Sequence, residues 1–276
     1  MKILNFSFET ELRFSEPVTR HNFVLRCLPS TTPTQTVLEA QTMVTPTTTI
    51  AHQTDGFGNL VQVGRIDPKH REFSFTSSGT VVVEVETDAS EPLHPMYLRP
   101  SRMTQPGPHV AAFAEDVLRV CRNLPPYDKA LRLSNALHAT MAYEQGVTDV
   151  GTCAEEALAG GRGVCQDFAH VLVALCREAG VAARYVNGFL IGEGETHAWV
   201  EVYDGCHWRG VDPTNNALVS NDYIALAHGR DFSDCPIERG VFRGNAHQRQ
   251  KVHVQVIDDA VEGMAELAAQ AQGGIR

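Results

Sequence analysis

A glycine-rich turn that leads directly into an amphipathic helix is the most constraining feature of this 276-residue chain. The segment Gly160–His170 reads GGRGVCQDFAH, and apolar residues then recur every three or four positions until Gly180. This spacing predicts a helix that begins near Val164 and ends at Gly180. Cys165 therefore lies in the first helical turn, where free backbone N–H groups and the positive end of the helix dipole favour a thiolate.

A second segment, Thr196–Asp212, predicts a β-hairpin because aromatic and β-branched residues alternate on both sides of Asp204-Gly205. A two-residue turn at this dipeptide places His197 directly opposite Asp212. Opposed residues carry Cβ atoms about 4.5–5.5 Å apart, which is close enough for a carboxylate to hold and orient an imidazole. The pair thus supplies a base and its orienting group for Cys165, although contact with that cysteine depends on the tertiary fold.

The order Cys165, His197, Asp212, in the contexts GVCQDFAH, THAWVEVY and VDPTNN, resembles the core of the transglutaminase-like superfamily. The segments RYVNGF, GRDFSD and DGFGN are similar to a bacterial branch of transglutaminase-like cysteine proteases with an N-terminal β domain. The resemblance implies an α+β fold. Its papain-like/transglutaminase-like core packs the nucleophile helix on an antiparallel sheet, and a β-sandwich-like domain precedes that core.

Composition divides the chain into three predicted parts. Residues 1–97 are rich in Thr, Val and Phe with frequent turn signals, which predicts an N-terminal β-rich domain. Prolines cluster between Glu91 and Pro108, as is typical of a boundary, and residues 98–257 form the predicted catalytic core. Residues 258–276 are rich in Ala and Glu and predict a C-terminal helical tail.

Charge and cysteine content restrict the partners and the compartment. The net charge of −10, from 23 basic and 33 acidic residues, argues against nucleic acid or an anionic membrane as a partner. The chain has no run of about 20 apolar residues for a membrane span and no signal-peptide pattern. Seven cysteines without CxxC spacing predict a reduced, cytoplasmic protein. No feature of the sequence sets an oligomeric state.

Two further residues are candidates for substrate binding. Trp199 falls on the predicted face of His197, with Gly210 opposite to leave room for its ring, and packing within the hairpin is the alternative. Gln166 follows the cysteine and is expected either to line the cleft or to cap the helix. The sequence lacks CxxC, HxxxH and HExxH spacing, so we expect neither a metal nor a cofactor.

The predicted chemistry is acyl transfer. Cys165 attacks a peptide or carboxamide carbonyl, His197 protonates the leaving amine, and Asp212 orients His197. The backbone N–H of Cys165 is a first oxyanion donor, and the resemblance implies a second donor from earlier in the chain, at Asn135 or near Tyr143.

The expected activity is hydrolysis of a peptide or carboxamide bond in a peptide or protein substrate, and an amidase that acts on non-protein substrates such as cell-wall or poly-amino-acid peptides is a further possibility. Animal transglutaminases usually carry Trp where this chain has Gln166, so protein cross-linking is the alternative activity. A catalytically silent peptide-binding module of the same fold is the alternative from a different functional class.

Overall fold

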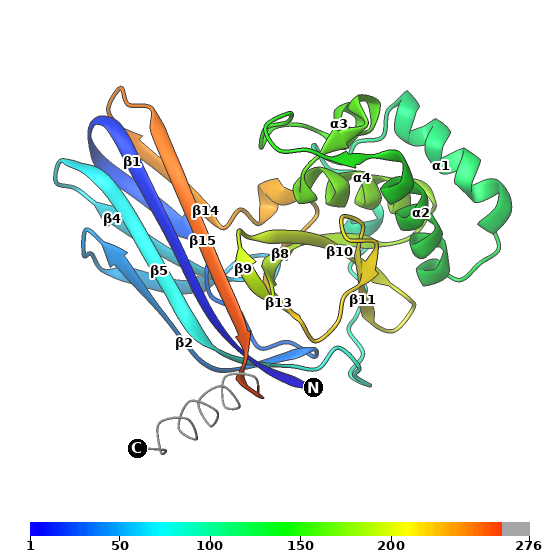
Figure 1. The fold of residues 1–276 in the computed structure, drawn as a ribbon, viewed down its shortest axis with the longest axis horizontal. Coiled ribbons are helices and arrows are strands. Elements are labelled where there is room, and N and C mark those ends of the chain that lie inside the picture. The colour runs from blue at the N-terminus through cyan, green and yellow to red at the C-terminus, as the bar shows by residue number, and fades with distance from the viewer. Residues whose placement is uncertain (261–276) are drawn as a thin grey trace, which may run out of the picture.

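A computed structural model describes residues 1–260 of the chain. Two β-sheets and a group of helices make up the fold, with the larger sheet on the left of Figure 1 and the helices on the right. The eight-stranded sheet has β1 (Lys2–Leu25) at its centre. Its other strands are β2 (Gln35–Thr45), β3 (Ile50–Thr54), β4 (Leu60–Ile66), β5 (His70–Val83), β9 (Gly192–Gly194), β14 (Glu238–Arg243) and β15 (Gln248–Asp258).

The two halves of strand β1 pair with different strands of this sheet. Its first half pairs with β5 and β15, and its second half pairs with β4 and β14, with a register shift after Arg13. Residues on one face of the first half are buried, from Leu4 to Phe14, and alternate with more exposed neighbours. This period of two is expected of a strand that covers a core with one face.

The chain returns to the first sheet near its end. Within the range that the sequence assigns to the catalytic core, β14 and β15 pair with β1, and β15 does so without interruption from Gln248 to Asp258. Strand β15 also pairs with β9, which follows β8 of the core sheet. The predicted helical tail beyond residue 260 lies outside the described residues.

The second sheet is antiparallel and carries the helices on one face. Its strand order is β12 (Ala217–Leu218), β11 (Trp208–Asp212), β10 (His197–Tyr203), β8 (Ala183–Leu190) and β13 (Tyr223–Gly229). The helices are α1 (Pro108–Cys121), α2 (Pro126–Thr140), α3 (Ala154–Gly160) and α4 (Cys165–Glu178). Short elements complete this part of the fold: β6 (Ala142–Tyr143), β7 (Arg162–Gly163), and the 3-10 helices η1 (Pro95–Leu98) and η2 (Phe232–Asp234).

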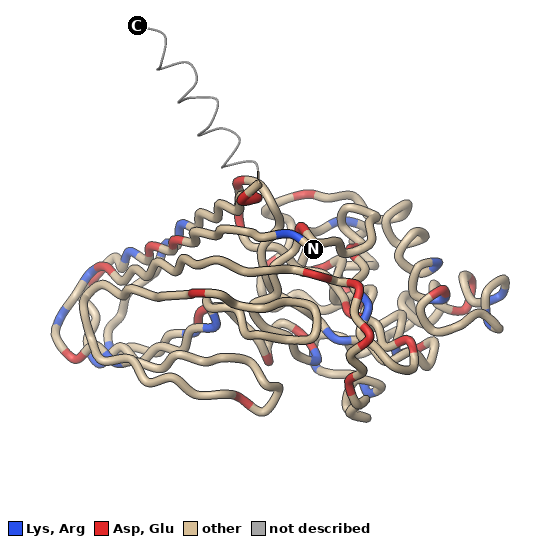
Figure 2. Tube along the Cα trace, turned by 90° about the horizontal axis from the view of Figure 1, so that it is seen from below, with Lys and Arg blue, Asp and Glu red and all other residues tan. Residues whose placement is uncertain are grey.

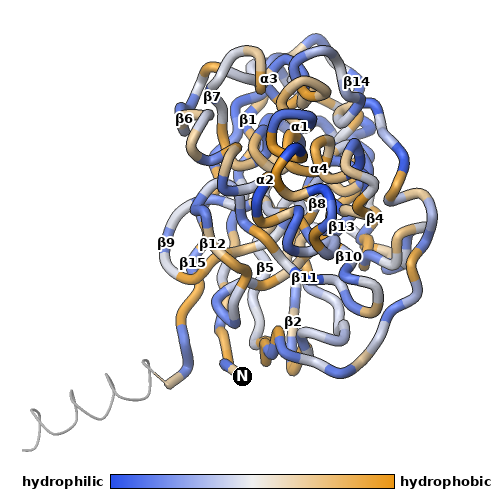
Figure 3. Tube along the Cα trace, turned by 90° about the vertical axis from the view of Figure 1, so that its right-hand side faces the viewer, coloured by the Kyte–Doolittle hydropathy of each residue, from blue (hydrophilic) through white to orange (hydrophobic). Residues whose placement is uncertain are grey.

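Helix α4 lies at the centre of this second unit. Its residues from Asp167 to Arg177 are all buried, because α1, α2 and α3 pack around it and β8 and β10 lie beneath it. Figure 3, which looks onto α1 and α2, shows hydrophobic stretches of α4 next to them. A helix that begins at Cys165 and packs on an antiparallel sheet, with a β-rich N-terminal region, confirms the predicted α+β fold class.

The two sheets share an apolar interface. Phe189 of β8 contacts Phe6 and Phe8 of β1, with ring centroids 5.5 and 5.2 Å apart. Ile224 and Leu226 of β13 join the same buried cluster. The core sheet is therefore covered by helices on one face and by the N-terminal sheet on the other.

Charged side chains lie mainly on the outside of this assembly. Figure 2 shows Lys and Arg positions interspersed with Asp and Glu positions along the long strands and the helices. Within residues 1–260, no helix is long and apolar enough to cross a membrane.

Candidate active site

Cys165 is the first residue of α4, as the glycine-rich sequence predicts. Asp167 fixes this helix start, because its Oδ2 accepts hydrogen bonds from the Val164 N–H at 2.8 Å and from the Thr148 hydroxyl at 2.7 Å. Gly163 is needed for this contact, since a Cβ there would lie only 2.5 Å from Asp167 Oδ2. Asp167 is therefore the capping residue, whereas Gln166 lines the cleft and its Nε2 donates to the Val150 carbonyl at 3.5 Å.

The hairpin exists, but its predicted register is wrong by two residues. The loop contains four residues, Asp204–His207, and Asp204 Oδ1 accepts hydrogen bonds from the N–H groups of Cys206 and His207, each at 2.9 Å. These bonds stabilise the longer loop, so Tyr203 pairs with Trp208 instead of Cys206. A shift by two residues preserves the face of every side chain, because side-chain direction has a period of two.

His197 and Asp212 consequently still meet, although they are not directly opposed. His197 Nε2 lies 2.7 Å from Asp212 Oδ2, and the two residues come from the neighbouring strands β10 and β11. Diagonal neighbours on one face of a sheet are within reach of long side chains. The predicted base and its orienting carboxylate are thus in contact.

Asp212 is held by more partners than the sequence reveals. It is fully buried, and its carboxylate accepts hydrogen bonds from the Tyr223 hydroxyl at 2.9 Å, from Asn215 Nδ2 at 2.7 Å and from the Thr214 N–H at 2.9 Å. Burial raises the pKa of Asp212, but hydrogen bonds from His197 and Asn215 outweigh it and lower that pKa. Asp212 therefore stays ionised beside His197.

Tyr223 was missed by the sequence reasoning. It comes from β13, two strands away from β10 in the sheet order, and no local spacing connects it to Asp212. Asn215 follows Asp212 by three residues within the VDPTNN segment. Its contact with Asp212 is therefore local in the sequence.

The tertiary fold brings Cys165 to His197. Cys165 and His197 line the same cleft, and interaction with the Cys165 thiol is one of the causes that raise the pKa of His197. Burial lowers the pKa of His197, but the hydrogen bonds to Asp212 and Cys165 outweigh it and raise that pKa to about 9. The imidazole is therefore held in its protonated form between two groups that favour a positive charge.

A cleft of about 680 Å³ opens over these residues. Cys165, Gln166 and His197 line it on the side of α4 and β10. Residues between 190 and 196, a segment that contains β9, also line the cleft, together with Phe232 and Val254. The cysteine and the histidine of the predicted triad thus face a space large enough for part of a peptide.

Trp199 does not line this cleft. It is only 1% exposed, and its ring packs behind His197, at 6.3 Å between centroids and 28° between planes. Gly188 makes room for the ring, since a Cβ there would lie 2.5 Å from Trp199 Cη2; Gly210 instead pairs with Glu201. Trp199 is therefore placed to support His197 and has no surface for contacting a substrate.

The two candidate sources of a second oxyanion donor separate in space. Asn135 is exposed on α2 and does not line the cleft, whereas Tyr143 of β6 and the nearby Gln145 do. Strand β6 pairs with β7, which leads into Cys165, and this pairing keeps the Tyr143 region beside the nucleophile.

The described part of the chain contains no group of three or more His, Cys, Asp or Glu side chains arranged to hold a metal ion. The arrangement of Cys165, His197 and Asp212 is suited to nucleophilic attack by a thiol with an adjacent, oriented base.

Comparison with known proteins identifies relatives of both units. Residues 112–213 match the family model of the transglutaminase-like superfamily, and residues 4–82 match that of the bacterial transglutaminase-like N-terminal region. An uncharacterized protein of Mycobacterium leprae (strain TN) is 28% identical over 270 residues, which cover 88% of this chain and 94% of that protein. An uncharacterized protein of Mycobacterium tuberculosis (strain ATCC 25618 / H37Rv) is 29% identical over 248 residues, with 75% of each chain covered.

A solved structure has the same fold. It is that of a "Putative Cysteine Protease" from Cytophaga hutchinsonii, which superposes with a TM-score of 0.76 over 94% of this chain and 92% of that chain. The sequence identity is 24%, so the likeness concerns the arrangement of the elements.

Proposed function

We propose that this chain, whose residues 112–213 are a transglutaminase-like core and whose residues 4–82 are a bacterial transglutaminase-like N-terminal region, is a thiol-dependent acyl-transfer enzyme. The proposed reaction is hydrolysis of a peptide or carboxamide bond. The observation that carries the proposal is the contact of His197 with both Cys165 and Asp212 at the edge of an open cleft.

The proposed mechanism has two steps. The Cys165 thiolate attacks the substrate carbonyl carbon, the C–N bond breaks, and His197 gives its proton to the departing amine. Water then attacks the acyl-thioester, His197 takes up a proton of that water, the C–S bond breaks, and the acid leaves with Cys165 restored as the thiolate beside protonated His197. The backbone N–H of Cys165, at the start of α4, is placed to donate to the oxyanion, and Tyr143 and Gln145 are candidates for a second donor.

We propose hydrolysis over transfer to an amine because part of the cleft lining is exposed. Three consecutive exposed residues, Glu193, Gly194 and Glu195, are among those that line the cleft. Transglutaminase activity requires that an amine reach the thioester before water does, and a water-excluding site favours such reactions. Protein-glutamine transglutaminase activity and silent peptide binding remain the two alternatives.

A reducing compartment such as the cytoplasm is part of the proposal. All seven cysteines are free thiols, and Cys165 must stay reduced to act as a nucleophile. Peptides or proteins are the proposed partners, since the cleft accommodates an extended chain.

Alkylation by iodoacetamide tests the nucleophile directly. We expect Cys165 to react at least tenfold faster than Cys206 at pH 7, although Cys206 is the exposed cysteine, because Cys165 begins α4 and shares the cleft with His197. Rates are measured by peptide mapping in the wild type, in His197→Ala and in Cys206→Ser. His197→Ala should reduce the rate at Cys165 to that of an ordinary thiol, and Cys206→Ser should leave it unchanged.

The fate of the acyl group distinguishes the activities. With a fluorogenic peptide mixture as substrate, hydroxylamine added as a competing amine should yield only a minor hydroxamate product beside the acid. Predominant hydroxamate at millimolar amine would favour the transglutaminase alternative. Equal, slow alkylation of all seven cysteines would contradict the proposed function and support a silent binding module.

A further inference from the structure

Part of the lining of the catalytic cleft comes from the edge strand of a sheet. Strand β9 is the last strand of the eight-stranded sheet and pairs on one side with β15 (Figure 1). Among residues 1–260, no strand pairs with its other side. The cleft is lined by an unbroken run of the chain from Glu193 to His197. Because consecutive residues of a strand point their side chains to opposite faces, such a run also presents its main chain to the cleft.

The direction of the main-chain groups in β9 follows from its neighbour Ile191. The Ile191 N–H donates to the Asp222 carbonyl at 2.9 Å and not to β15. Main-chain groups of an antiparallel strand point alternately to one side and the other. Glu193, two residues after Ile191, therefore turns its N–H and C=O away from β15, while Gly192 and Gly194 on either side of it pair with Val256 and Val254 of β15.

These main-chain groups of Glu193 are available to a ligand. Within residues 1–260, no main-chain group bonds to them from the side away from β15, and both Glu193 and Gly194 are exposed. The position of a Cβ on Gly194 has no other atom within 4 Å, so no side chain covers the strand at this point. Unpaired, accessible groups on a sheet edge pair readily with another extended chain.

The free edge lies within reach of the candidate catalytic residues. Glu193 precedes His197 by four residues, which span at most about 14 Å when fully extended. His197 and Cys165 line the same cleft as Glu193. An extended ligand of about four residues can therefore pair with Glu193 at one end and present a carbonyl to Cys165 at the other.

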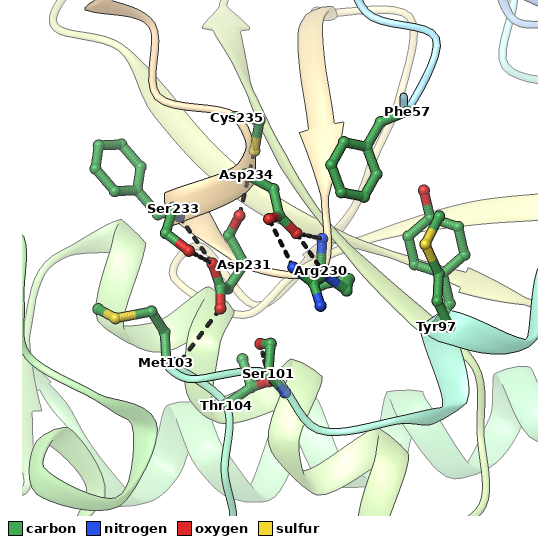
Figure 4. Close-up of polar contacts among 12 residues, drawn as sticks. Phe57, Tyr97, Ser101, Met103, Thr104, Arg230, Asp231, Ser233, Asp234 and Cys235 are labelled. Atoms are coloured by element: carbon green, nitrogen blue, oxygen red, sulfur yellow. Dashed lines mark hydrogen bonds and ion pairs between the residues drawn. The ribbon is translucent and has the colours of Figure 1, made fainter. Parts of the chain in front are cut away.

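The backbone that carries Phe232, a partly exposed residue of the same lining, is fixed from two sides. The Phe232 N–H donates to His170 Nε2 on α4 at 3.1 Å. The preceding Asp231 is 1% exposed and accepts hydrogen bonds from the N–H groups of Met103, at 3.2 Å, and Ser233, at 2.8 Å (Figure 4). This part of the cleft is therefore formed before a ligand binds, which reduces the loss of conformational freedom on binding.

The side chains along this edge favour a transient occupant. Glu193 and Glu195 are both exposed and carry like charges. Charged side chains on an edge strand disfavour its permanent pairing with another sheet. A substrate chain that binds and leaves therefore fits the edge better than a second copy of this protein.

We propose that β9 is the docking strand for the main chain of the substrate. An extended polypeptide segment pairs with the N–H and C=O of Glu193 and thereby places one of its carbonyls at Cys165. The proposal rests on the proposed function and narrows its substrate class to extended peptide segments, because a small carboxamide is too short to reach Glu193.

Two series of alanine peptides that alkylate Cys165 provide the test. Iodoacetyl peptides carry their residues after the reactive carbon, and peptidyl chloromethyl ketones carry them before it, so the series extend to opposite sides of the nucleophile. Labelling is followed by intact mass and peptide mapping, and each rate is divided by the iodoacetamide rate of the same protein. In one series we expect the rate to rise about tenfold or more up to about four residues, as two main-chain hydrogen bonds provide, and then to level off.

N-methylation of single amides in the fastest probe tests strand pairing itself. Loss of the one N–H that bonds to the Glu193 carbonyl should slow labelling about threefold to tenfold. Methylation of the amide on either side should have little effect, because a strand uses every second residue to pair with a given neighbour. Equal effects at successive amides would contradict strand pairing.

Glu193→Pro tests the protein side of the same contact. Proline removes the N–H that faces away from β15, and edge strands accept proline at such positions. The variant should lose most of the dependence of the labelling rate on probe length. Glu193→Ala is the matched control, because it removes the carboxylate and keeps the N–H, and it should show the length dependence of the wild type. If thermal melting shows that Glu193→Pro is unfolded, the N-methylated probes decide.

The outcomes for the docking strand and for the proposed function are distinguishable. Fast reaction of Cys165 with iodoacetamide but no length dependence in either series would overturn the docking strand alone. A wild-type dimer that Glu193→Pro dissociates, measured by sedimentation, would assign the edge to a second copy and would also overturn it.

Slow reaction of Cys165 with iodoacetamide would overturn the proposed function. Titration of acetyl-tetraalanine amide into Cys165→Ala, followed by amide NMR, then reads the docking strand without the thiol. A shift of the Glu193 amide resonance that exceeds the shifts elsewhere in the sheet supports the docking strand, and an unchanged Glu193 resonance overturns it.

Discussion

At the scale of single residues, the charge of His197 couples the candidate site to the stability of the fold. Its pKa of about 9 lies above the usual 6.5, so the folded state holds a proton that the unfolded state releases between these values. The resulting stabilisation is fully present below pH 6.5 and is lost as the pH rises through 9. The lowered pKa of Asp212 has the opposite dependence: its stabilisation is fully present above pH 3.8 and is lost as the pH falls through the folded value.

The first prediction concerns His197→Gln. The free energy of unfolding of the wild type should exceed that of the variant by more at pH 6 than at pH 10, with a difference between the two pH values of at most about 3 kcal/mol. Urea denaturation of both proteins at both pH values measures it, and other titrating groups cancel in the comparison. A wild-type advantage that stays constant or grows with pH would contradict the raised pKa.

At the scale of elements, a glycine in β8 makes room for the tryptophan ring that packs behind His197 of β10. Gly188 pairs with His197 across these strands, and a Cβ at Gly188 would lie 2.1 Å from the Ile224 carbonyl oxygen and 2.5 Å from the Trp199 ring. The absence of a side chain therefore lets Trp199 lie flat behind His197.

The second prediction concerns Gly188→Ala. Overpacking should lower the free energy of unfolding by about 1–3 kcal/mol, and displacement of Trp199 should slow iodoacetamide labelling of Cys165, because His197 loses its support. Gly160→Ala at the end of α3 is the control, since its Cβ meets no atom within 4 Å. The control should match the wild type in thermal melting and labelling; an unchanged labelling rate in Gly188→Ala would refute the supporting role of Trp199.

At the scale of the whole molecule, we expect the two sheets to unfold as one cooperative structure. Phe189 is fully buried in the core sheet, yet it belongs to the hydrophobic cluster of the N-terminal sheet. Strand β15 adds a second link by pairing with both β1 and β9. Unfolding of either sheet would expose the interface of the other.

The third prediction concerns Phe189→Ala. The substitution should lower the free energy of unfolding by about 3–5 kcal/mol, whereas Val120→Ala, at a side chain that is 88% exposed, should change it by less than about 0.5 kcal/mol. In the wild type, urea transitions followed by tryptophan fluorescence and by far-UV circular dichroism should coincide, because both tryptophans lie in the core sheet while the longest strands lie in the other. Separate transitions would show that the units unfold independently.

The sequence by itself determined the features that depend on local periodicity. The helix start at Cys165 follows from the spacing of apolar residues, and the shared face of His197 and Asp212 survives a two-residue error in register because strand side chains repeat every two positions. The family resemblance, now matched in both units, came from these same local segments.

Only the tertiary structure decided which residues from distant segments of the chain come into contact. The contact of Cys165 with His197, the hydroxyl of Tyr223 on Asp212, the burial of Trp199 and the return of β15 to β1 all join distant segments. Local spacing fixes the direction of each side chain relative to its own backbone, whereas such contacts depend on how whole elements pack together. For that reason the residues proposed for the candidate site could be named from the sequence, and the contacts that support them could not.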